Sequence, residues 1–262
     1  MPMKTNIPSL SVCSIITALA LLVIPLIPSK VAALSVVNQS FEDTTGLGAP
    51  FNEFHFGLNP GWDYYDPNNI VSGGNGANGI FTGTLDVAAG SPWFDGNTSP
   101  DGDRVAILFG YGNAASAGAG EYGLEQTLAD SLQANTEYQL QVEVGNIASG
   151  FSDNGSYFPL DGFPGYRVEL LAGGVVIAQE DSMAIDEGEF ATSVVTFVSG
   201  NTHAQLGQSL GIRLINLNNV TAPNDVEVDF DDVRLNASPV PIPAALWLFM
   251  SALLLGFPLL KK

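Results

Sequence analysis

The chain has 262 residues, and its 27 acidic residues far outnumber its eight basic ones, which gives a formal net charge of −19 at pH 7. Such a surface repels nucleic acid and anionic lipid headgroups, so we exclude nucleic acid as a partner. The single cysteine, Cys13, lies in the first apolar segment. A chain that loses this segment therefore has no disulfide, no cysteine-ligated zinc and no thiol nucleophile.

The first 33 residues have the pattern of a secretory signal peptide. Lys4 gives a positively charged start, residues 12–27 are mostly apolar, and residues 31–33 place small side chains where a signal peptidase reads them. We therefore expect residues 1–33 to be removed by cleavage after Ala33. An uncleaved N-terminal membrane anchor is the alternative, but Pro25 and the shortness of the apolar run disfavour it.

Residues 34–236 have the pattern of one large domain built from short strands. The clearest strand is expected at 136–145, where apolar residues from Tyr138 to Val144 alternate with polar ones. Because no amphipathic helix separates the apolar runs, we expect an all-β antiparallel β-sandwich. Further strands are expected at 104–109, 123–128, 166–171, 175–179, 191–198, 210–217 and 226–235.

Two long stretches of the domain, residues 44–102 and 145–165, are less regular and rich in turn residues. Long ordered loops of this kind often carry binding function, so we expect a ligand site to draw on them.

Several short motifs follow one another along this domain. They are N-Q-S-F-E at 38–42, G-W at 61–62, Q-T at 126–127, T-E-Y at 136–138 and D-D-V-R-L at 231–235. In this order they resemble the galactose-binding-like jelly rolls that include many carbohydrate-binding modules. The resemblance implies a jelly-roll sandwich with the ring of Trp62 in its core.

The same resemblance implies a structural calcium ion. In such jelly rolls calcium bridges the first and last strands, so Glu42 and Asp231 are the first candidate ligands, with Asp232 as a substitute. Calcium takes roughly six to eight oxygen ligands, so backbone carbonyls and water would complete the shell. The alternative is that these carboxylates only face solvent on an edge strand.

Aromatic side chains that stack on sugar rings would form the glycan site that the resemblance implies. Trp93 and Tyr157 are the candidates that we expect to be exposed in loops, and Tyr64 and Tyr65 are further candidates. For each of them, packing inside the core or a loop is the alternative. Possible platforms also include Tyr111 and Phe158.

The domain contains no recognisable catalytic motif. His55 and His203 are far apart in the sequence, and no G-x-S-x-G nucleophile motif is present. Residues 227–232 superficially resemble the E-x-D-x-x-E strand of jelly-roll glucanases but depart from it at Asp231 and Asp232. Because no acid–base pair can be argued from sequence, we expect a protein that is not an enzyme.

The last segment, residues 237–262, combines a proline motif, an apolar span and a basic end. The motif contains Pro239, Pro241 and Pro243, residues 244–260 carry no charge, and two lysines close the chain at 261–262. The apolar span has the minimum length for a transmembrane helix, and the lysines would stay in the cytoplasm. The segment resembles the PEP-CTERM signal that exosortases process, and a plain membrane anchor is the alternative.

These observations together predict an exported protein with a β-sandwich jelly roll between an N-terminal signal helix and a C-terminal transmembrane helix. We expect it first in the inner membrane as a precursor and then in the cell envelope or extracellular matrix. Its expected partners are signal peptidase, an exosortase-like protease and extracellular polysaccharide, in a non-catalytic binding or structural role. A purely structural or adhesive matrix protein, or a glycan hydrolase, are the alternatives.

Overall fold

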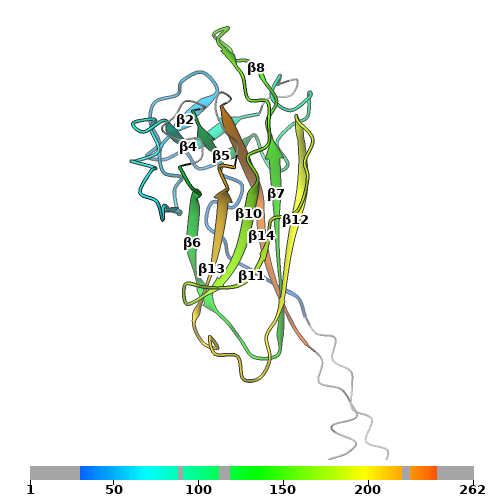
Figure 1. Ribbon diagram of the computed structural model, residues 1–262. Helices are drawn as coiled ribbons and strands as arrows, with labels where there is room; N and C mark the ends of the chain where they lie inside the picture. The colour runs from blue at the N-terminus through cyan, green and yellow to red at the C-terminus, as the bar shows by residue number, and fades with distance from the viewer. Residues whose placement is uncertain (1–29, 88–90, 112–118, 220–224, 241–262) are drawn as a thin grey trace, which may run out of the picture.

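The chain folds into two antiparallel β-sheets packed face to face (Figure 1). The computed structural model describes residues 30–87, 91–111, 119–219 and 225–240, and within these ranges it contains strands and turns but no α-helix. The predicted all-β antiparallel sandwich is therefore confirmed for the described residues. The expected transmembrane helix and residues 1–29 of the expected signal peptide fall outside them, as do Pro241 and Pro243. Ala32 and Ala33, the last residues of the expected signal peptide, lie in strand β1 (Ala32–Leu34).

The first sheet has the strand order β12-β7-β14-β5-β4-β2, and β1 pairs with the end of β14. Its long central strand β14 pairs with β7 on one side and with β5 on the other. The strands of this sheet are β1 (Ala32–Leu34), β2 (Phe54–Phe56), β4 (Ile80–Asp86), β5 (Arg104–Gly110), β7 (Thr136–Asn146), β12 (Glu189–Val198) and β14 (Val226–Pro239).

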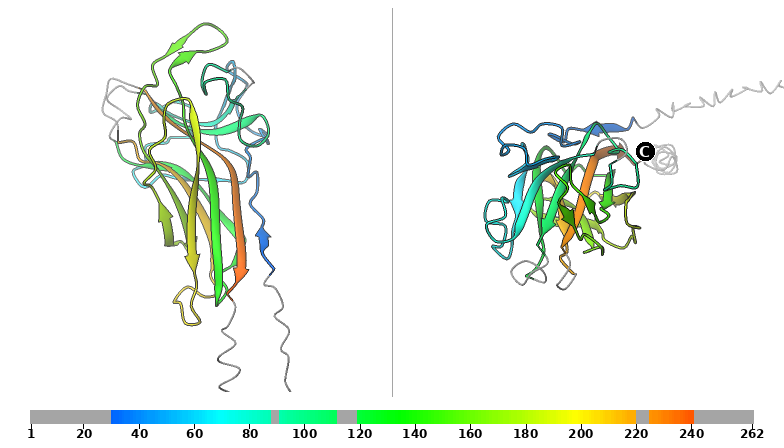
Figure 2. Two further views of the ribbon diagram at one scale, coloured as in Figure 1. Left: turned by 90° about the vertical axis from the view of Figure 1, so that its right-hand side faces the viewer. Right: turned by 90° about the horizontal axis from the view of Figure 1, so that it is seen from above.

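The second sheet has the order β11-β10-β13-β6-β3, and a separate two-stranded hairpin, β8-β9, rises at one end of the sandwich (Figure 1). The hairpin lies at the end opposite to the pole where β1 and the last residues of β14 meet (Figure 2). These strands are β3 (Asp63–Tyr65), β6 (Tyr122–Ser131), β8 (Gly150–Phe151), β9 (Tyr157–Phe158), β10 (Tyr166–Ala172), β11 (Val175–Glu180) and β13 (Ser209–Asn216).

Period-two alternation explains how the sheets bury their inner faces. In β7 the apolar residues Tyr138, Leu140, Val142 and Val144 are all buried in the core between the sheets. Successive strand residues point to opposite faces, so the polar residues between them face outward. Trp62 is also buried in this core, as the sequence predicted.

A second, smaller apolar cluster covers the outer face of the first sheet. In β5, Ala106 and Leu108 belong to the main core, whereas Val105, Ile107 and Phe109 belong to this second cluster. Loops from the expected irregular stretches lie over these outward residues. One end of the first sheet is thus buried on both faces, and this layer holds the site described below.

All eight expected strands are present, with boundaries shifted by a few residues. The stretch 44–102, expected to be loop, contains the short strands β2 and β3 and the longer strand β4. Pro239 ends β14 opposite Thr136. Within the parts of the chain that the structure describes, no helix has the length and apolar character needed to cross a membrane.

Candidate active site

A cavity of about 300 Å³ lies over the outer face of β2, β4 and β5. Its wall is almost entirely aromatic and aliphatic, and Glu227 supplies its one carboxyl group. This volume is near the lower end of small-molecule binding sites. The lining residues are Phe51, Phe54, Phe56, Phe81, Ile107, Phe109, Tyr111, Phe158, Leu160 and Glu227.

Strand register brings the floor of this cavity together. Phe81 of β4 pairs with Phe109 of β5, and Phe109 in turn pairs with Glu227 of β14. Directly opposed residues of neighbouring strands share one face of the sheet, with their Cβ atoms about 5 Å apart. Two aromatic rings and one acid therefore form a single row across three strands.

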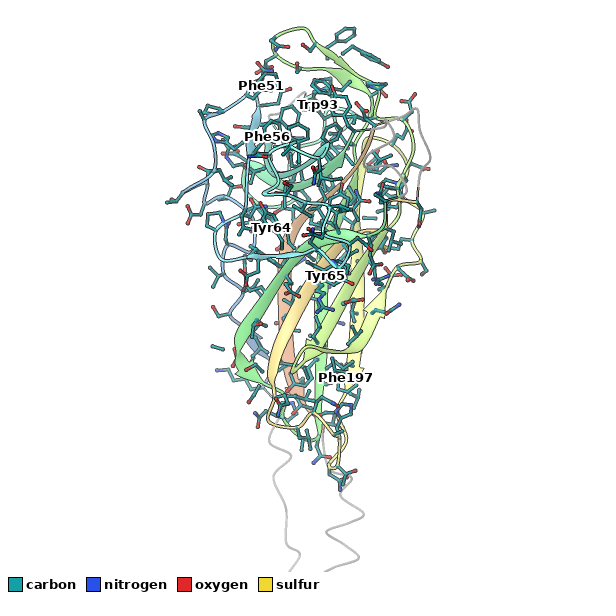
Figure 3. The ribbon with its side chains drawn as sticks, turned by 60° about the vertical axis from the view of Figure 1, so that its left-hand side comes forward. Phe51, Phe56, Tyr64, Tyr65, Trp93 and Phe197 are labelled. Atoms are coloured by element: carbon teal, nitrogen blue, oxygen red, sulfur yellow. The ribbon has the colours of Figure 1, made fainter. Side chains whose placement is uncertain are left out.

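The aromatic walls support one another through ring contacts. The Phe81 ring lies 4.8 Å from Phe56 and 5.6 Å from Phe109, measured between centroids. Phe158, carried by β9, contacts Phe54 at 6.2 Å. Phe51 and Phe56 lie near Trp93 at the hairpin end of the sandwich (Figure 3). Rings at these separations and tilts attract each other in addition to the free energy gained by burying their surface. These contacts fix the positions of the rings in the cavity wall.

Glu227 is only 3% exposed. Burial raises the pKa of its carboxyl to about 8; a hydrogen bond with Asp229 lowers it, and the charge of Asp225 raises it. Burial therefore favours the protonated form of this carboxyl. A protonated acid at the floor of an apolar cavity is a proton donor whose strength is matched to neutral conditions.

Asp229 lies next to Glu227 on the same face of β14 and is fully buried. Burial, followed by the charge of Glu227, raises the pKa of Asp229 well above its ordinary value. Apart from Glu227, the Asp229 carboxyl oxygens have no hydrogen-bond partner among the described residues. The two acids thus form a coupled buried pair, and burial favours the protonated form of both.

An aromatic stack covers the Asp229 end of this pair. Asp229 is paired with Gly145 of β7, and a Cβ atom at Gly145 would lie 2.7 Å from the Phe190 ring and 3.0 Å from the Phe94 ring. Phe94 and Phe190 stack on each other at 4.1 Å. Their rings fill the space that a side chain at position 145 would take, and so cover the Asp229 side of the pair.

The structure places Trp93 and Tyr157 differently from each other. Trp93 is 1% exposed and donates its indole N–H to Glu53 at 3.0 Å, so the expectation that it is exposed is wrong. Its ring packs behind the cavity wall, edge-on to Phe54 and Phe158. Tyr157 is 54% exposed at the hairpin, where it contacts Phe151. Neither residue lines the cavity.

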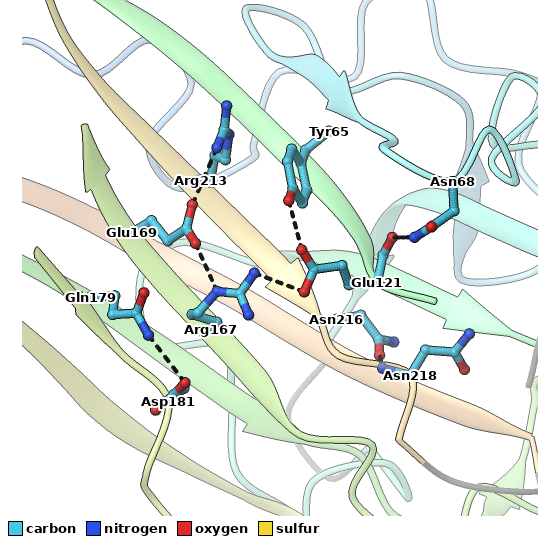
Figure 4. Close-up of polar contacts among 10 residues, drawn as sticks. All are labelled: Tyr65, Asn68, Glu121, Arg167, Glu169, Gln179, Asp181, Arg213, Asn216 and Asn218. Atoms are coloured by element: carbon cyan, nitrogen blue, oxygen red, sulfur yellow. Dashed lines mark hydrogen bonds and ion pairs between the residues drawn. The ribbon is translucent and has the colours of Figure 1, made fainter. Parts of the chain in front are cut away.

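Tyr64 and Tyr65 both belong to structural contacts. Tyr64 packs against the main core, and its hydroxyl accepts a hydrogen bond from Thr82. Tyr65 donates to Glu121 at 2.6 Å, and the guanidinium of Arg213 lies 4.5 Å from its ring centroid. This group continues through Arg167 and the buried Glu169 on the outer face of the second sheet (Figure 4).

The expected calcium ligands converge in part on one loop. Glu42 accepts the backbone N–H groups of Asp103 and Arg104, and Asp231 accepts that of Asp101. Asp231 is fully buried, and burial raises its pKa to about 8. Asp232 forms an ion pair with Arg234 at 2.9 Å instead. No group of three or more acidic, histidine or cysteine side chains with metal-site geometry occurs in the described ranges.

A sequence profile described as HpiC1-like, HpiC1 cyclase, matches residues 32–236 of the chain. The chain belongs to the HpiC1 cyclase family. A Stig cyclase from Fischerella sp. TAU is 38% identical, with a TM-score of 0.70, over 81% of this chain and all of the other; its structure holds (3Z)-3-(1-methyl-2-pyrrolidinylidene)-3H-indole. No curated protein is detectably similar.

Two further structures of Fischerella cyclases agree with this family membership. One, with 4-(1H-indol-3-yl)butan-2-one bound, is 37% identical over 80% of this chain and all of that chain, with a TM-score of 0.69. Another, without a ligand, is 35% identical over 81% of this chain and 98% of that chain, with a TM-score of 0.68.

Membership of a cyclase family corrects several expectations from the sequence. The resemblance to exosortase-sorted proteins with a carbohydrate-binding module did not identify the family, and the expected absence of enzyme function is wrong. The expected polysaccharide partner is also wrong, because the relatives bind indole-derived small molecules. The short motifs that carried the resemblance describe a sandwich shared by proteins of different function.

The strand that carries Glu227 was predicted, but its acids were not identified as catalytic from the sequence. Its signal was available: Glu227, Asp229 and Asp231 alternate with Val228 and Phe230, so three acids share one face of a buried strand. Six lining residues, including Phe51 and Phe158, come from the two stretches expected to contribute a ligand site. Tyr111 and Phe158, which line the cavity, were among the aromatic residues expected to stack on a sugar ring.

Proposed function

We propose that the protein is a cyclase that closes a ring in an indole-bearing small molecule inside the aromatic cavity. The observation that carries this proposal is the single buried carboxyl of Glu227, whose pKa burial raises, at the floor of a cavity lined by phenylalanines. The indole-derived ligands of the Fischerella relatives support the substrate class. A flat, largely apolar indole suits walls of this kind.

In the proposed reaction Glu227 acts as a general acid. Its proton adds to an unsaturated carbon of the substrate, which leaves a cation elsewhere on the same molecule. A second π bond of that molecule attacks the cation and forms the new ring bond. The ring-closed cation then loses a proton to the Glu227 carboxylate, so the product is an isomer of the substrate and the acid is restored.

The cavity wall favours this route electrostatically. The faces of aromatic rings are electron-rich and attract a cation within about 6 Å. Phe56, Phe81 and Phe109 place three such rings around the space next to Glu227. The rings therefore stabilise the developing positive charge of the substrate without a second carboxylate. Such a carboxylate could remove a proton from the cation before the ring closes.

Replacing Glu227 by Gln tests this assignment. Gln keeps the size and hydrogen-bonding shape of the protonated acid but cannot donate a proton as an acid. We expect turnover of indoles with an unsaturated side chain, followed as same-mass product by liquid chromatography and mass spectrometry, to fall by about 10²- to 10⁴-fold. Binding of 4-(1H-indol-3-yl)butan-2-one, measured by calorimetry, should change by no more than about threefold.

The matched control is Glu137→Gln, an exposed carboxylate at the far end of β7. This variant should turn over substrate at the wild-type rate. If Glu227→Gln kept wild-type turnover as well, Glu227 would not be the acid.

We further propose that calcium joins Glu42 to Asp231. Both carboxylates lie against residues 101–104, and Asp231 is buried with only backbone N–H groups as recorded partners. Backbone oxygens and water would supply the remaining ligands. This ion would tie together three segments that are distant in sequence.

We also propose that the protein is exported, held first in the inner membrane and then located in the cell envelope or extracellular matrix. The signal-peptide pattern of residues 1–33 and the uncharged run 244–260 support this location. N-terminal sequencing of the protein from a bacterial periplasm should begin at Leu34. Recovery of the full-length chain from the cytosol would contradict export.

A further inference from the structure

A glycine-rich loop packs against Phe81, one of the residues that line the cavity. This loop, residues 72–79, lies before β4 and returns to it: Gly76 donates its N–H to Ile80 at 2.9 Å, and Asn75 forms a β-bridge with Phe81. The loop therefore lies against the strand that carries the Phe81 ring. The position of the loop therefore limits how far the Phe81 ring can move away from the cavity.

Gly76 touches the tip of the Phe81 ring. A Cβ atom at position 76 would lie 2.1 Å from Cζ of Phe81 and 2.4 Å from Cε1. Carbon atoms in contact are normally about 3.5 to 4.0 Å apart, so any side chain here would displace the ring. On its other sides Phe81 meets Phe56 and Phe109, which both line the cavity. A displaced ring therefore moves into the cavity.

We propose that Gly76 is a specificity-determining residue that sets the width of the cavity through the Phe81 ring. The inference rests on the proposed function, because it assumes that the indole-bearing ligand occupies this cavity. Phe81 shares its cross-strand row with Phe109 and Glu227. A residue larger than glycine at position 76 would narrow the space next to the acid and select smaller ligands.

The chain offers a matched control in the same loop. Gly73 has a φ of +87° and Gly76 a φ of +84°, so alanine strains the backbone similarly at both positions. A Cβ atom at Gly73, however, has no neighbour within 4 Å. Comparing Gly76→Ala with Gly73→Ala thus separates the contact with Phe81 from backbone strain.

The experiment combines crystal structures of both variants with calorimetric titration of indole and 4-(1H-indol-3-yl)butan-2-one. In Gly76→Ala we expect the Phe81 ring to shift towards Glu227. The preference for the larger ligand over indole should fall by about tenfold or more. Gly73→Ala should keep the ring position and a wild-type preference within about twofold. Adding Phe81→Leu to Gly76→Ala should restore the preference, because the shorter side chain frees the space.

The inference is overturned if Gly76→Ala leaves Phe81 in place and the loop moves instead, or if both glycine variants show the same preference. The ring position is read from crystals without any ligand, so this result does not depend on the proposed reaction. Loss of turnover in Glu227→Gln, or its absence, is a separate result and judges the proposed function alone.

Discussion

Buried acids in β14 are the residues that most distinguish this sandwich from a purely structural one. Glu227, Asp229 and Asp231 are all nearly or fully inaccessible, and they alternate with the core residues Val228 and Phe230. Burying a carboxyl without a cationic partner costs free energy and raises its pKa. A chain selected only for stability would place apolar residues there, so these acids indicate chemistry at the cavity floor.

The raised pKa of Glu227 makes stability depend on pH in a definite direction. The folded protein holds this proton up to about pH 8, whereas the unfolded chain releases it near 4.5. Between these values the folded state binds more protons, so the free energy of unfolding falls as pH rises, by up to about 1.4 kcal/mol per pH unit. Below about pH 4.5 this contribution is constant.

Glu227→Gln removes this titration. Urea denaturation of both proteins between pH 5 and 8 should show the variant gaining stability over the wild type as pH rises, by up to ~1.4 kcal/mol per unit. Carboxyls remote from Glu227 titrate in both proteins, so their effect cancels in the difference. Asp229 adds a contribution in the same direction, because burial and, in addition, the charge of Glu227 raise its pKa in the wild type. A difference that stayed constant across this range would mean that Glu227 is already ionised at pH 5.

At the level of elements, long strands with strict alternation were predictable and short strands were not. The alternating apolar residues of β7, β10 and β13 are sufficient to predict these strands from the local sequence. β2 and β3 have three residues each, and β8 and β9 have two. Segments of this length form strands only because a neighbouring strand pairs with them. The local sequence pattern carries no information about this pairing.

The candidate site shows the same limit. The acids of β14 could be placed on one face from their spacing, but not beside Phe81 and Phe109. That row requires the register between β4, β5 and β14, and Glu227 of β14 lies more than a hundred positions after Phe109 of β5. Trp93 illustrates the converse: its neighbours Pro92 and Phe94 suggested an exposed loop, yet the second apolar cluster buries all but 1% of it.

At the scale of the whole molecule, the two poles of the sandwich carry different features. The first and last described strands meet at one pole, and the hairpin lies at the other (Figure 2). The wall of the aromatic cavity includes Phe158 of this hairpin. Glu42 and Asp231 both bind the backbone of residues 101–104, so this junction ties together three segments that are distant in sequence.

The proposed calcium ion would act on this junction and so on the stability of the whole fold. At a free calcium concentration 100-fold above the dissociation constant, binding adds about 2.7 kcal/mol to the free energy of unfolding. For a domain of this size that corresponds to a rise in Tm of about 5 to 10 °C. Thermal unfolding in calcium and in EDTA measures it directly, and Glu42→Gln should abolish the difference, whereas the exposed Glu137→Gln should retain it. Equal Tm values for the wild type in calcium and in EDTA would show that hydrogen bonds alone hold the junction.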